Sequence, residues 1–481
     1  MNSSNLVKAS TGYYPWFIAF MGMVALFLSN GMTATGITIF DPSLLDEFGW
    51  SRGDLKFRDA LTFWTTACIS PFAGILIDRL NPKYLLLFGF SLLTLGYVGY
   101  YSLANGAPVL LLILIGVMTL AALAGILALA IRSLFSAWPV WIAPLVGCIA
   151  AAIAIWYYSQ HWMTSALKQT YMIHLMFSLA MSTSGSMVVI FLVSSWFVTH
   201  RGLAIGIALV GTSLGSALLP KFDPFLILSV GWRRAFLYNA LMPVIAFLVV
   251  VLFVKGTPRH AGTTAVGQKP TVADLKQQGM LYSDAIRTRT FWAIACSGFL
   301  TYYAIFGFLQ NFVLHLNKGF GIALPVAGGM LFNFSVVAMV AKLFNGALAD
   351  RIDRHKVFLT CLAIMLAGVL GIASMKREWV APSAIIIGLG WGGLFTLYNM
   401  LAVNNFGLRE IGRINGAISF FESIGVGFGS WITGALFDKF GSYQIAFIVI
   451  AVAVFLALLI GTQIRSEIDE EGRPVRPRGA T

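Results

Sequence analysis

Long runs of apolar residues, each separated from the next by a short polar or charged turn, recur along almost the whole chain. A helix needs about 20 apolar residues to cross the hydrocarbon core of a bilayer. The pattern therefore predicts an all-α membrane protein with about fourteen transmembrane helices. The expected spans are residues 13–39, 57–79, 84–104, 108–131, 138–159, 170–197, 202–220, 234–254, 290–314, 325–349, 356–374, 381–405, 413–436 and 443–464.

A charged turn after one of these runs has a degenerate copy far upstream. The turn reads Gly-Ala-Leu-Ala-Asp-Arg at 346–351, and its copy reads Gly-Ile-Leu-Ile-Asp-Arg at 74–79. A signature that occurs in both halves of a membrane protein indicates an internal repeat, as in many transporters. The turns are predicted to lock the outward-facing state on the cytoplasmic side, and a topology and folding signal is the alternative. The gating residues are then Asp78, Arg79, Asp350 and Arg351.

One long polar segment, 255–289, divides the chain into two parts. It is expected to be a cytoplasmic linker that ends in a short amphipathic helix. Residues 1–254 then form an N-terminal helix bundle and 290–464 a C-terminal one, followed by a polar cytoplasmic tail at 465–481. The first half is longer between corresponding turns, by a surplus that fits an inserted helix pair at 108–159. An even number of extra spans keeps every later loop on its proper side of the membrane.

Composition excludes a soluble protein, because 58% of the 481 residues are hydrophobic, 11% are charged and the mean hydropathy is +0.83. A net charge of +13 would suggest a nucleic-acid partner in a soluble chain. Here most lysines and arginines fall in short loops on one side, as the positive-inside rule requires, and no nucleic-acid partner is expected. The same bias places both termini in the cytoplasm. A bacterial inner membrane is the expected location.

Two ionisable residues lie inside apolar runs of the second half. Lys342 stands alone in the run at 325–349, and Glu422 lies about nine residues from the cytoplasmic end of the run at 413–436. A lysine at such a depth costs roughly 2.5–3.5 kcal/mol on insertion scales, so it is usually partnered or functional. Lys342 is therefore predicted to bind an anion, with Glu422 as its counter-charge and as a proton carrier. The alternative is a permanent bridge that only joins two helices.

The span at 57–79 begins with a polar stripe at helical spacing, which includes Arg58 and Asp59. A stripe of this kind should face a cavity or another helix rather than lipid, which makes Asp59 a rival proton site. Because both residues lie near the start of the helix, a ring of charges at the outer membrane surface is an equally open interpretation.

Aromatic residues follow one face of the span at 381–405. Trp391, Phe395, Tyr398 and Asn399 are spaced i, i+4, i+7 and i+8. Packing is the commoner role of such a stripe, but the adjacent amide favours a face toward a cavity. Tyr303 of the span at 290–314 is added to the candidate substrate-binding residues.

These features resemble the major facilitator superfamily, whose loop signature matches the two Asp-Arg turns. Within it the chain is similar to the monocarboxylate transporter and oxalate–formate antiporter group. The supporting stretches are Phe-Gly-Trp-Ser-Arg at 48–52, Arg-Gly-Leu-Ala-Ile-Gly at 201–206, Ala-Ile-Arg-Thr-Arg-Thr-Phe-Trp at 285–292 and Phe-Gly-Leu-Arg at 406–409.

The resemblance implies a fold of two six-helix bundles, here with the extra pair inserted in the first half. It also implies that a basic residue four positions before the first glycine of the second loop signature binds the substrate carboxylate. Lys342 stands there, where the group usually has arginine, so a bidentate clamp becomes a point charge. Trp391 and Phe395 match the spacing of the antiporter's aromatic pair.

The sequence thus predicts a secondary transporter of a small organic anion, with a monocarboxylate as the expected substrate. It is expected to work by alternating access and to be coupled to protons. A proton-coupled exporter of amphiphilic drugs is the alternative. An enzyme is disfavoured because no cluster of His, Cys or paired acids has catalytic spacing. No cofactor is expected. The expected partners are the anion, protons and the bilayer, and the expected state is a monomer.

Overall fold

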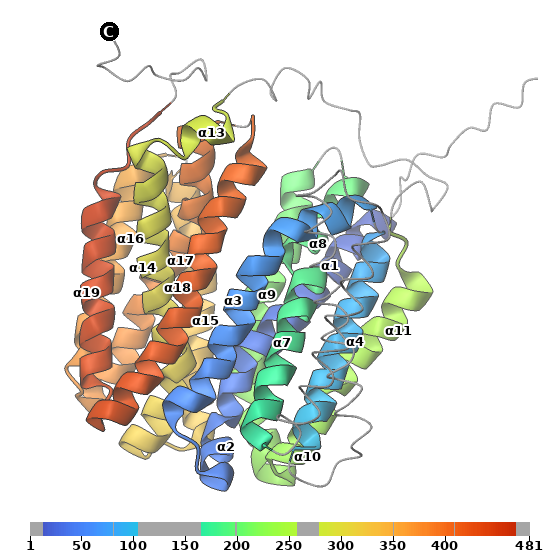
Figure 1. Cartoon of the computed structure of the whole chain (residues 1–481), viewed down its shortest axis with the longest axis vertical. Helices are drawn as coiled ribbons and strands as arrows, with labels where there is room; N and C mark the ends of the chain where they lie inside the picture. Colours follow the sequence, from blue (N-terminus) through green and yellow to red (C-terminus); the bar gives the residue numbers. More distant parts are fainter. Residues whose placement is uncertain are drawn as a thin grey trace, which may run out of the picture. The chain divides into compact units, whose positions relative to one another are not determined.

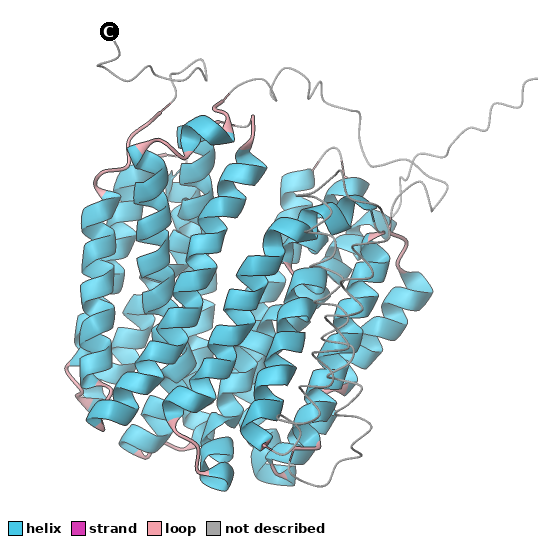
Figure 2. Ribbon diagram, in the orientation of Figure 1, coloured by secondary structure: helices cyan, strands magenta, loops and turns pink. Residues whose placement is uncertain are grey.

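The computed structural model describes residues 13–79, 81–103, 165–197, 200–256, 279–349, 351–407 and 409–467, with side chains given only to Ile69 in the first of these ranges. Every element in this part of the chain is a helix (Figure 2). An isolated antiparallel β-bridge joins Gly279 and Gly407. The predicted all-α class is confirmed.

The helices group into two compact units. The first unit comprises residues Met1–Ser43 and Cys68–Gln268, and the second comprises Leu44–Ala67 and Lys269–Thr481. Two helices cross these boundaries, α2 (Asp41–Phe48) and α3 (Arg52–Arg79). Helix α3 therefore has its first half in the second unit and its last turns in the first.

In the first unit, glycines let the long helices come close together. A Cβ atom on Gly211 would lie 2.0 Å from the Met23 carbonyl oxygen, and one on Gly215 would lie 2.4 Å from that of Phe27. Such small residues drive helix association where the solvent is lipid. The described helices of this unit are α1 (Tyr14–Asn30), η1 (Gly31–Thr35), η2 (Gly36–Phe40), α4 (Pro82–Tyr101), α7 (Ala166–Ser184), α8 (Ser186–Trp196), α9 (Arg201–Val230), α10 (Trp232–Asn239) and α11 (Leu241–Phe253).

The second unit holds six long helices that lie side by side (Figure 1). Helix pairs again meet at glycines: a Cβ atom on Gly429 would lie 2.1 Å from the Tyr303 carbonyl oxygen. The described helices are α13 (Tyr282–Ala285), α14 (Arg289–Leu314), η4 (His315–Gly319), α15 (Leu324–Ala349), α16 (Arg354–Ala373), α17 (Arg377–Phe406), α18 (Ile411–Phe440) and α19 (Gln444–Gly461).

The first half of α3 is docked on α18. The backbone N–H groups of Arg52 and Gly53 donate to the Asp438 carboxylate, which caps the start of α3. Further along, the Trp64 indole N–H donates to the Ile424 carbonyl oxygen at 3.2 Å. The Arg52 guanidinium also lies over the Phe437 ring, 3.4 Å from its centroid.

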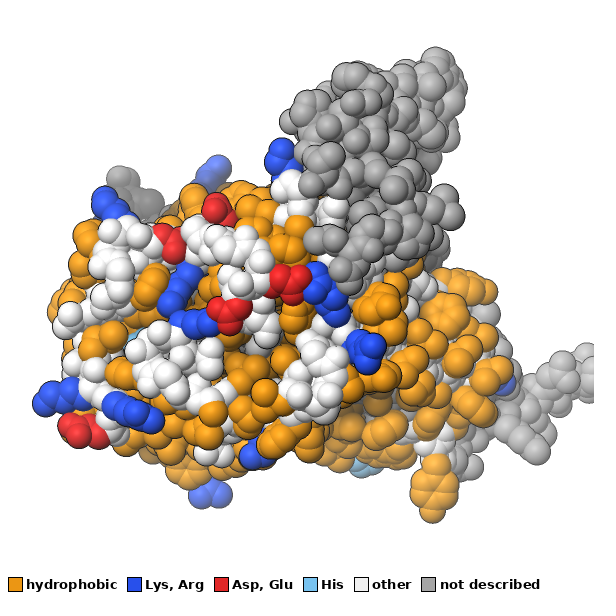
Figure 3. Space-filling view, turned by 90° about the horizontal axis from the view of Figure 1, so that it is seen from below, with side chains coloured by type: hydrophobic (Ala, Val, Ile, Leu, Met, Phe, Trp, Pro, Cys, Tyr) orange, Lys and Arg blue, Asp and Glu red, His pale blue; other side chains and the backbone are white. Residues whose placement is uncertain are grey.

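Eleven segments in the described ranges are long and apolar enough to cross a membrane, and the 28-residue α3 is a further long helix. The face drawn in Figure 3 shows Lys, Arg, Asp and Glu side chains scattered among hydrophobic ones. The twelve predicted spans that fall in the described ranges agree with these helices in position. The largest difference is the span expected at 202–220, which continues as α9 to Val230 with Pro220 and Pro224 inside it. Transmembrane helices tolerate proline because neighbouring groups satisfy the freed carbonyls.

Several predicted features lie outside the described residues. These are the inserted pair at 108–159, most of the linker at 255–289, most of the tail at 465–481, Asp350, and the side chains of Asp78 and Arg79.

Candidate functional site

Close packing of α15 on α17 fixes the position of Lys342. A Cβ atom on Gly392 of α17 would lie 2.2 Å from the Ala338 carbonyl oxygen and 2.9 Å from the backbone nitrogen of Lys342. The glycine thus lets the two backbones touch beside the lysine. One turn along α17, the Phe395 ring lies under the ammonium, with Lys342 Nζ 4.2 Å from the ring centroid. This is cation–π geometry, worth about 0.5–2 kcal/mol according to its exposure.

The Phe395 ring belongs to an aromatic cluster contributed by α14 and α17. Trp391 meets Phe395 at 6.0 Å between ring centroids, and Tyr302 of α14 meets Trp391 edge-on at 5.1 Å. Phe306 stacks parallel to Tyr302 at 6.4 Å. All four rings and Lys342 keep part of their surface accessible. They could therefore present an apolar face and one cation to a solute.

The structure places Tyr302 in this cluster and gives Tyr303 a different position. Tyr303 is buried, and its backbone lies against Gly429 of α18. Consecutive helix residues point about 100° apart, so only one of the two tyrosines can face α17. The i, i+4 spacing of Tyr302 and Phe306 is the sequence signal that could have pointed to Tyr302 in place of Tyr303.

Tyr398 and Asn399 are both engaged by other side chains. Tyr398 is 1% exposed, and its hydroxyl hydrogen-bonds Ser297 at 2.9 Å and Thr301 at 2.8 Å. The Asn399 amide donates to the Phe395 carbonyl oxygen at 3.3 Å and accepts from Asn415 of α18 at 2.8 Å. Tyr398 thus joins α14 to α17 beneath the cluster, whereas Asn399 joins α17 to α18 and remains exposed.

Glu422 of α18 lies on the Tyr398 side of the cluster. A Cβ atom on Gly298 would lie 3.2 Å from Glu422 Cγ, so this glycine makes room for the acid against α14. Ser419 lies one turn earlier on the same face of α18, and the Glu422 carboxylate acts electrostatically on the Tyr398 hydroxyl. No ion pair between Glu422 and Lys342 occurs among the contacts of the described residues. The bridge considered from the sequence is therefore not formed in this structure.

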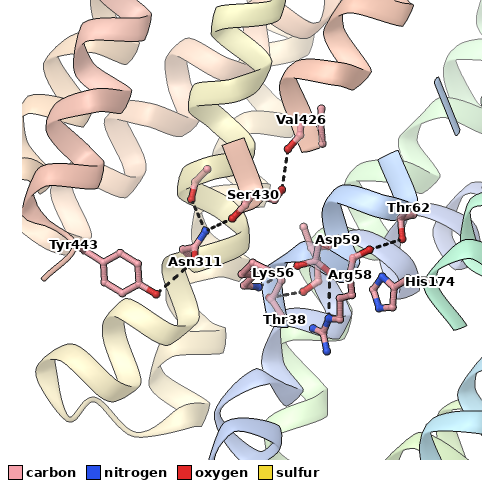
Figure 4. Close-up of polar contacts among 12 residues, drawn as sticks. Thr38, Lys56, Arg58, Asp59, Thr62, His174, Asn311, Val426, Ser430 and Tyr443 are labelled. Carbon is pink, nitrogen blue, oxygen red and sulfur yellow. Dashed lines mark hydrogen bonds and ion pairs between the residues drawn. The ribbon is translucent and has the colours of Figure 1, made fainter. Parts of the chain in front are cut away.

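Asp59 lies in a buried ion-pair cluster on α3. Its carboxylate oxygens lie 3.3 Å from Lys56 Nζ and 3.3 Å from Arg58 Nε (Figure 4). Arg58 is 0% exposed and Asp59 is 1% exposed, so they do not form a surface ring of charges. Removing one member of such a cluster leaves an uncompensated buried charge, which is costly. This arrangement suits a structural network better than a site that exchanges protons.

The predicted gate is described only in part, on the α15–α16 turn. Arg351 is exposed there. Asp353 accepts from the His355 backbone N–H at 2.8 Å and caps α16, as a helix-starting aspartate does. Arg354 donates from Nε to the Ala349 carbonyl oxygen at 3.3 Å and from Nη1 to Asn404 of α17. This turn is therefore tied to the end of the helix that carries the aromatic face.

A linker strap, residues 279–285, is fastened to the turn between α17 and α18. The Met280 N–H donates to the Phe406 carbonyl oxygen at 2.8 Å, and the Tyr282 N–H donates to Glu410 Oε2 at 2.7 Å. Arg413 pairs with Glu410 at 3.3 Å and lies over the Tyr282 ring. The hydrogen bond from the Tyr282 N–H is the main reason that the pKa of Glu410 is lowered.

Within the described residues, no group of three or more His, Cys, Asp or Glu side chains could hold a metal ion. What the site offers instead is one cation, one acid and an aromatic face, all on helices of the second unit. This set suits binding of an organic anion better than covalent chemistry.

The family model of the Major Facilitator Superfamily matches the chain over residues 136–429 and 294–480. Together the two matches cover well over half of the sequence. The chain belongs to the Major Facilitator Superfamily. It is therefore an integral membrane protein of a transporter family rather than an enzyme, as the sequence predicted.

Curated members of the superfamily resemble the chain at low identity. A glycerol-3-phosphate transporter of Bacillus subtilis (strain 168) is 22% identical over 56% of this chain and 66% of its own length. A hexuronate transporter of Escherichia coli (strain K12) is 24% identical over 57% of this chain and 68% of its own length. An MFS-type transporter of Gibberella moniliformis (strain M3125 / FGSC 7600) is 26% identical over 52% of this chain and 57% of its own length. The chain thus spans about half to two thirds of the length of these relatives.

Solved structures share the fold over nearly the whole chain. The crystal structure of a D-xylose–proton symporter superimposes with a TM-score of 0.65 at 12% identity, covering 96% of this chain and 99% of the symporter. A bacterial homologue of the human lysosomal transporter Spinster gives 0.63 at 11% identity, covering 97% of this chain and all of the homologue. At such identities the likeness establishes the superfamily fold and nothing of the solute.

Proposed function

We propose that this protein is a secondary active transporter that moves a small organic anion by alternating access and together with protons. The proposed anion is a monocarboxylate. The observation that carries the proposal is Lys342, whose ammonium lies over the Phe395 ring beside three more partly accessible aromatic rings. A cation on an aromatic face can bind a carboxylate, while the rings contact the apolar part of the same solute. Two relatives named for anionic solutes, glycerol-3-phosphate and hexuronate, support an anion.

The finer assignments belong to the same proposal. The chain is placed in the monocarboxylate transporter and oxalate–formate antiporter group on its motif stretches. Glu422 is the proton-coupling acid, and a substrate carboxylate is the counter-charge of Lys342. The two Asp-Arg turns are the cytoplasmic gate. The protein is a monomer in a bacterial inner membrane, has both ends in the cytoplasm and carries an additional helix pair in its first half.

Uptake into proteoliposomes tests this function, with acetate, lactate and benzoate as aliphatic, hydroxylated and aromatic probes. Lys342→Ala should abolish anion binding, and Lys342→Arg should retain part of it because the charge is kept and only its geometry changes. Glu422→Gln should still bind the anion but lose the dependence of uptake on pH. Wild-type anion affinity in Lys342→Ala would overturn the proposal.

The alternative function, export of amphiphilic drugs, predicts a different competition result. An aromatic face can also bind a cationic dye. If ethidium competes for the site while the three carboxylates do not, the drug exporter is the correct function. Competition by carboxylates alone supports the anion transporter.

A further inference from the structure

One face of α18 carries a stripe of polar residues that leads from the end of the helix to Glu422. Asn415, Ser419 and Glu422 are spaced i, i+4 and i+7, and each keeps part of its surface accessible. The stripe starts beside Arg413, whose side chain is 69% exposed. At about 1.5 Å per residue it is roughly 10 Å long.

Position and one hydrogen bond relate the members of the stripe to their surroundings. Ser419 lies three residues before Glu422 on the same helix face, and Asn415 donates to Asn399 of α17 at 2.8 Å. Polar side chains in an apolar helix are costly unless they face other helices or a hydrated space, and they often mark proton or ion pathways. If the stripe served only to hold α17 and α18 together, one hydrogen bond between the two helices would be enough, and Asn415 and Asn399 already form it. Ser419 and Glu422 are not needed for it.

We propose that the stripe of Asn415, Ser419 and Glu422 is the route by which protons reach the Glu422 carboxylate from the Arg413 end of α18. This inference rests on the proposed role of Glu422 in proton coupling. In the forward step, a proton delivered along the stripe forms one O–H bond on the carboxylate and neutralises its charge. On release, the same bond breaks and the proton leaves along an open route, so that no other reactant is required.

The groups that face Glu422 fit a route of this kind. Tyr302 of α14 and Tyr398 of α17 act on it electrostatically and carry no charge at neutral pH. Helix α19, which also packs on α18, has no titratable side chain. The titratable residues of α13, Tyr282 and Asp284, belong to the linker strap, where Tyr282 contacts Arg413 at the start of α18. Helix α3 also packs on α18, through Trp64, and its charged groups Lys56, Arg58 and Asp59 lie in their own buried ion-pair cluster. The proposed path therefore runs from Glu422 toward the strap.

The test compares two modes of lactate movement by the full-length protein in proteoliposomes. Net uptake driven by a pH gradient requires protons to load and unload, whereas lactate exchange at equal pH on both sides requires only solute binding and alternating access. Asn415→Leu and Ser419→Ala should slow net uptake by about fivefold, the factor of one lost hydrogen bond, and leave exchange unchanged. Asn405→Leu is the control, because that amide donates only to the Leu401 carbonyl oxygen of its own helix.

The outcomes separate the route from the function on which it rests. If Glu422→Gln keeps the pH dependence of uptake, the coupling acid is misassigned and the route fails with it. If Glu422→Gln loses that dependence while both stripe variants keep wild-type net uptake, the route alone is wrong. An equal loss of net uptake and exchange would assign the stripe to solute binding and also overturn the proposal. Should Asn415→Leu fail to fold, Ser419→Ala carries the same comparison.

Discussion

Replacing Gly392 by alanine should disturb the candidate site through the backbone alone. The added Cβ atom would lie 2.2 Å from the Ala338 carbonyl oxygen, 2.8 Å from Ala341 Cβ and 2.9 Å from the backbone nitrogen of Lys342. Real Cβ contacts stay beyond 3.0 Å, so α15 and α17 must separate locally by at least about 0.8 Å. Because backbone atoms cannot rotate away as a side-chain end can, the helices themselves must shift.

The expected cost follows from overpacking and from the lost position of Lys342. Inserting one extra carbon into a close-packed contact typically destabilises a protein by about 1–3 kcal/mol. A charged hydrogen bond to a solute contributes about 1.5–3 kcal/mol, so anion affinity should fall by at least about tenfold if the ammonium moves off its site. Thermal unfolding of the purified protein measures the first effect, and calorimetric titration with benzoate measures the second.

A matched control adds the same methyl group where there is space. Gly206 lies in the interior of α9, and a Cβ atom added to it would meet no other atom within 4 Å. Gly206→Ala should leave benzoate affinity unchanged and stabilise the helix by about 0.5–1 kcal/mol, because alanine loses less backbone entropy than glycine. Wild-type unfolding temperature and affinity in Gly392→Ala would refute the argument that this contact positions Lys342.

Three further predictions concern other contacts. Glu410→Gln should raise the hydrogen-exchange rate of the Tyr282 amide at neutral pH. The pKa of Glu410 is lowered from 4.5, so its carboxylate is ionised and the contact is complete at any pH above 4.5. In the wild type the contact should be lost only as the pH falls through the lowered pKa of Glu410. Gly298→Val should weaken the pH dependence of uptake more than Gly298→Ala, since only 3.2 Å separates a Cβ there from Glu422; equal effects would count against this reasoning. Asp438→Ala should lower stability by about 0.5–2 kcal/mol, as loss of a helix cap does, and Asp438→Asn should cost less; unchanged thermal unfolding in both would show that the cap is unimportant.

The architecture could be predicted because membrane helices are governed by local length and hydropathy. Each long helix of the described ranges lies where an apolar run predicted it, and the family match confirms the superfamily. The continuation of α9 past Pro220 was missed because proline breaks helices in water but not in this setting. That α3 divides between the two units also escaped prediction, since it depends on contacts with α18, more than 350 residues away.

The candidate site could be predicted where one helix contains the whole pattern. Trp391 and Phe395 share a face because they are one turn apart, and both enter the aromatic cluster. Which face of α14 meets them was decided by α14's own packing against α18, so Tyr302 rather than Tyr303 joined it. The Tyr398 hydroxyl was an attractive solute ligand in the sequence, yet its two partners come from α14, about 100 positions away.

The separation of Lys342 from Glu422 changes how coupling between anion and proton can be understood. Lys342 lies over Phe395, and ring contacts lead from Phe395 to Trp391 at 6.0 Å and from Trp391 to Tyr302 at 5.1 Å, on which Glu422 acts electrostatically. Since no ion pair joins Lys342 to Glu422 among the described residues, the proposed coupling does not require an anion to displace Glu422 from Lys342. Under the proposed function, the anion would bring a second negative charge into the same cluster of low polarity, and a proton on Glu422 would remove the repulsion between the two. Coupling of this kind acts through the electric field and needs the acid near the cation, but not in contact with it.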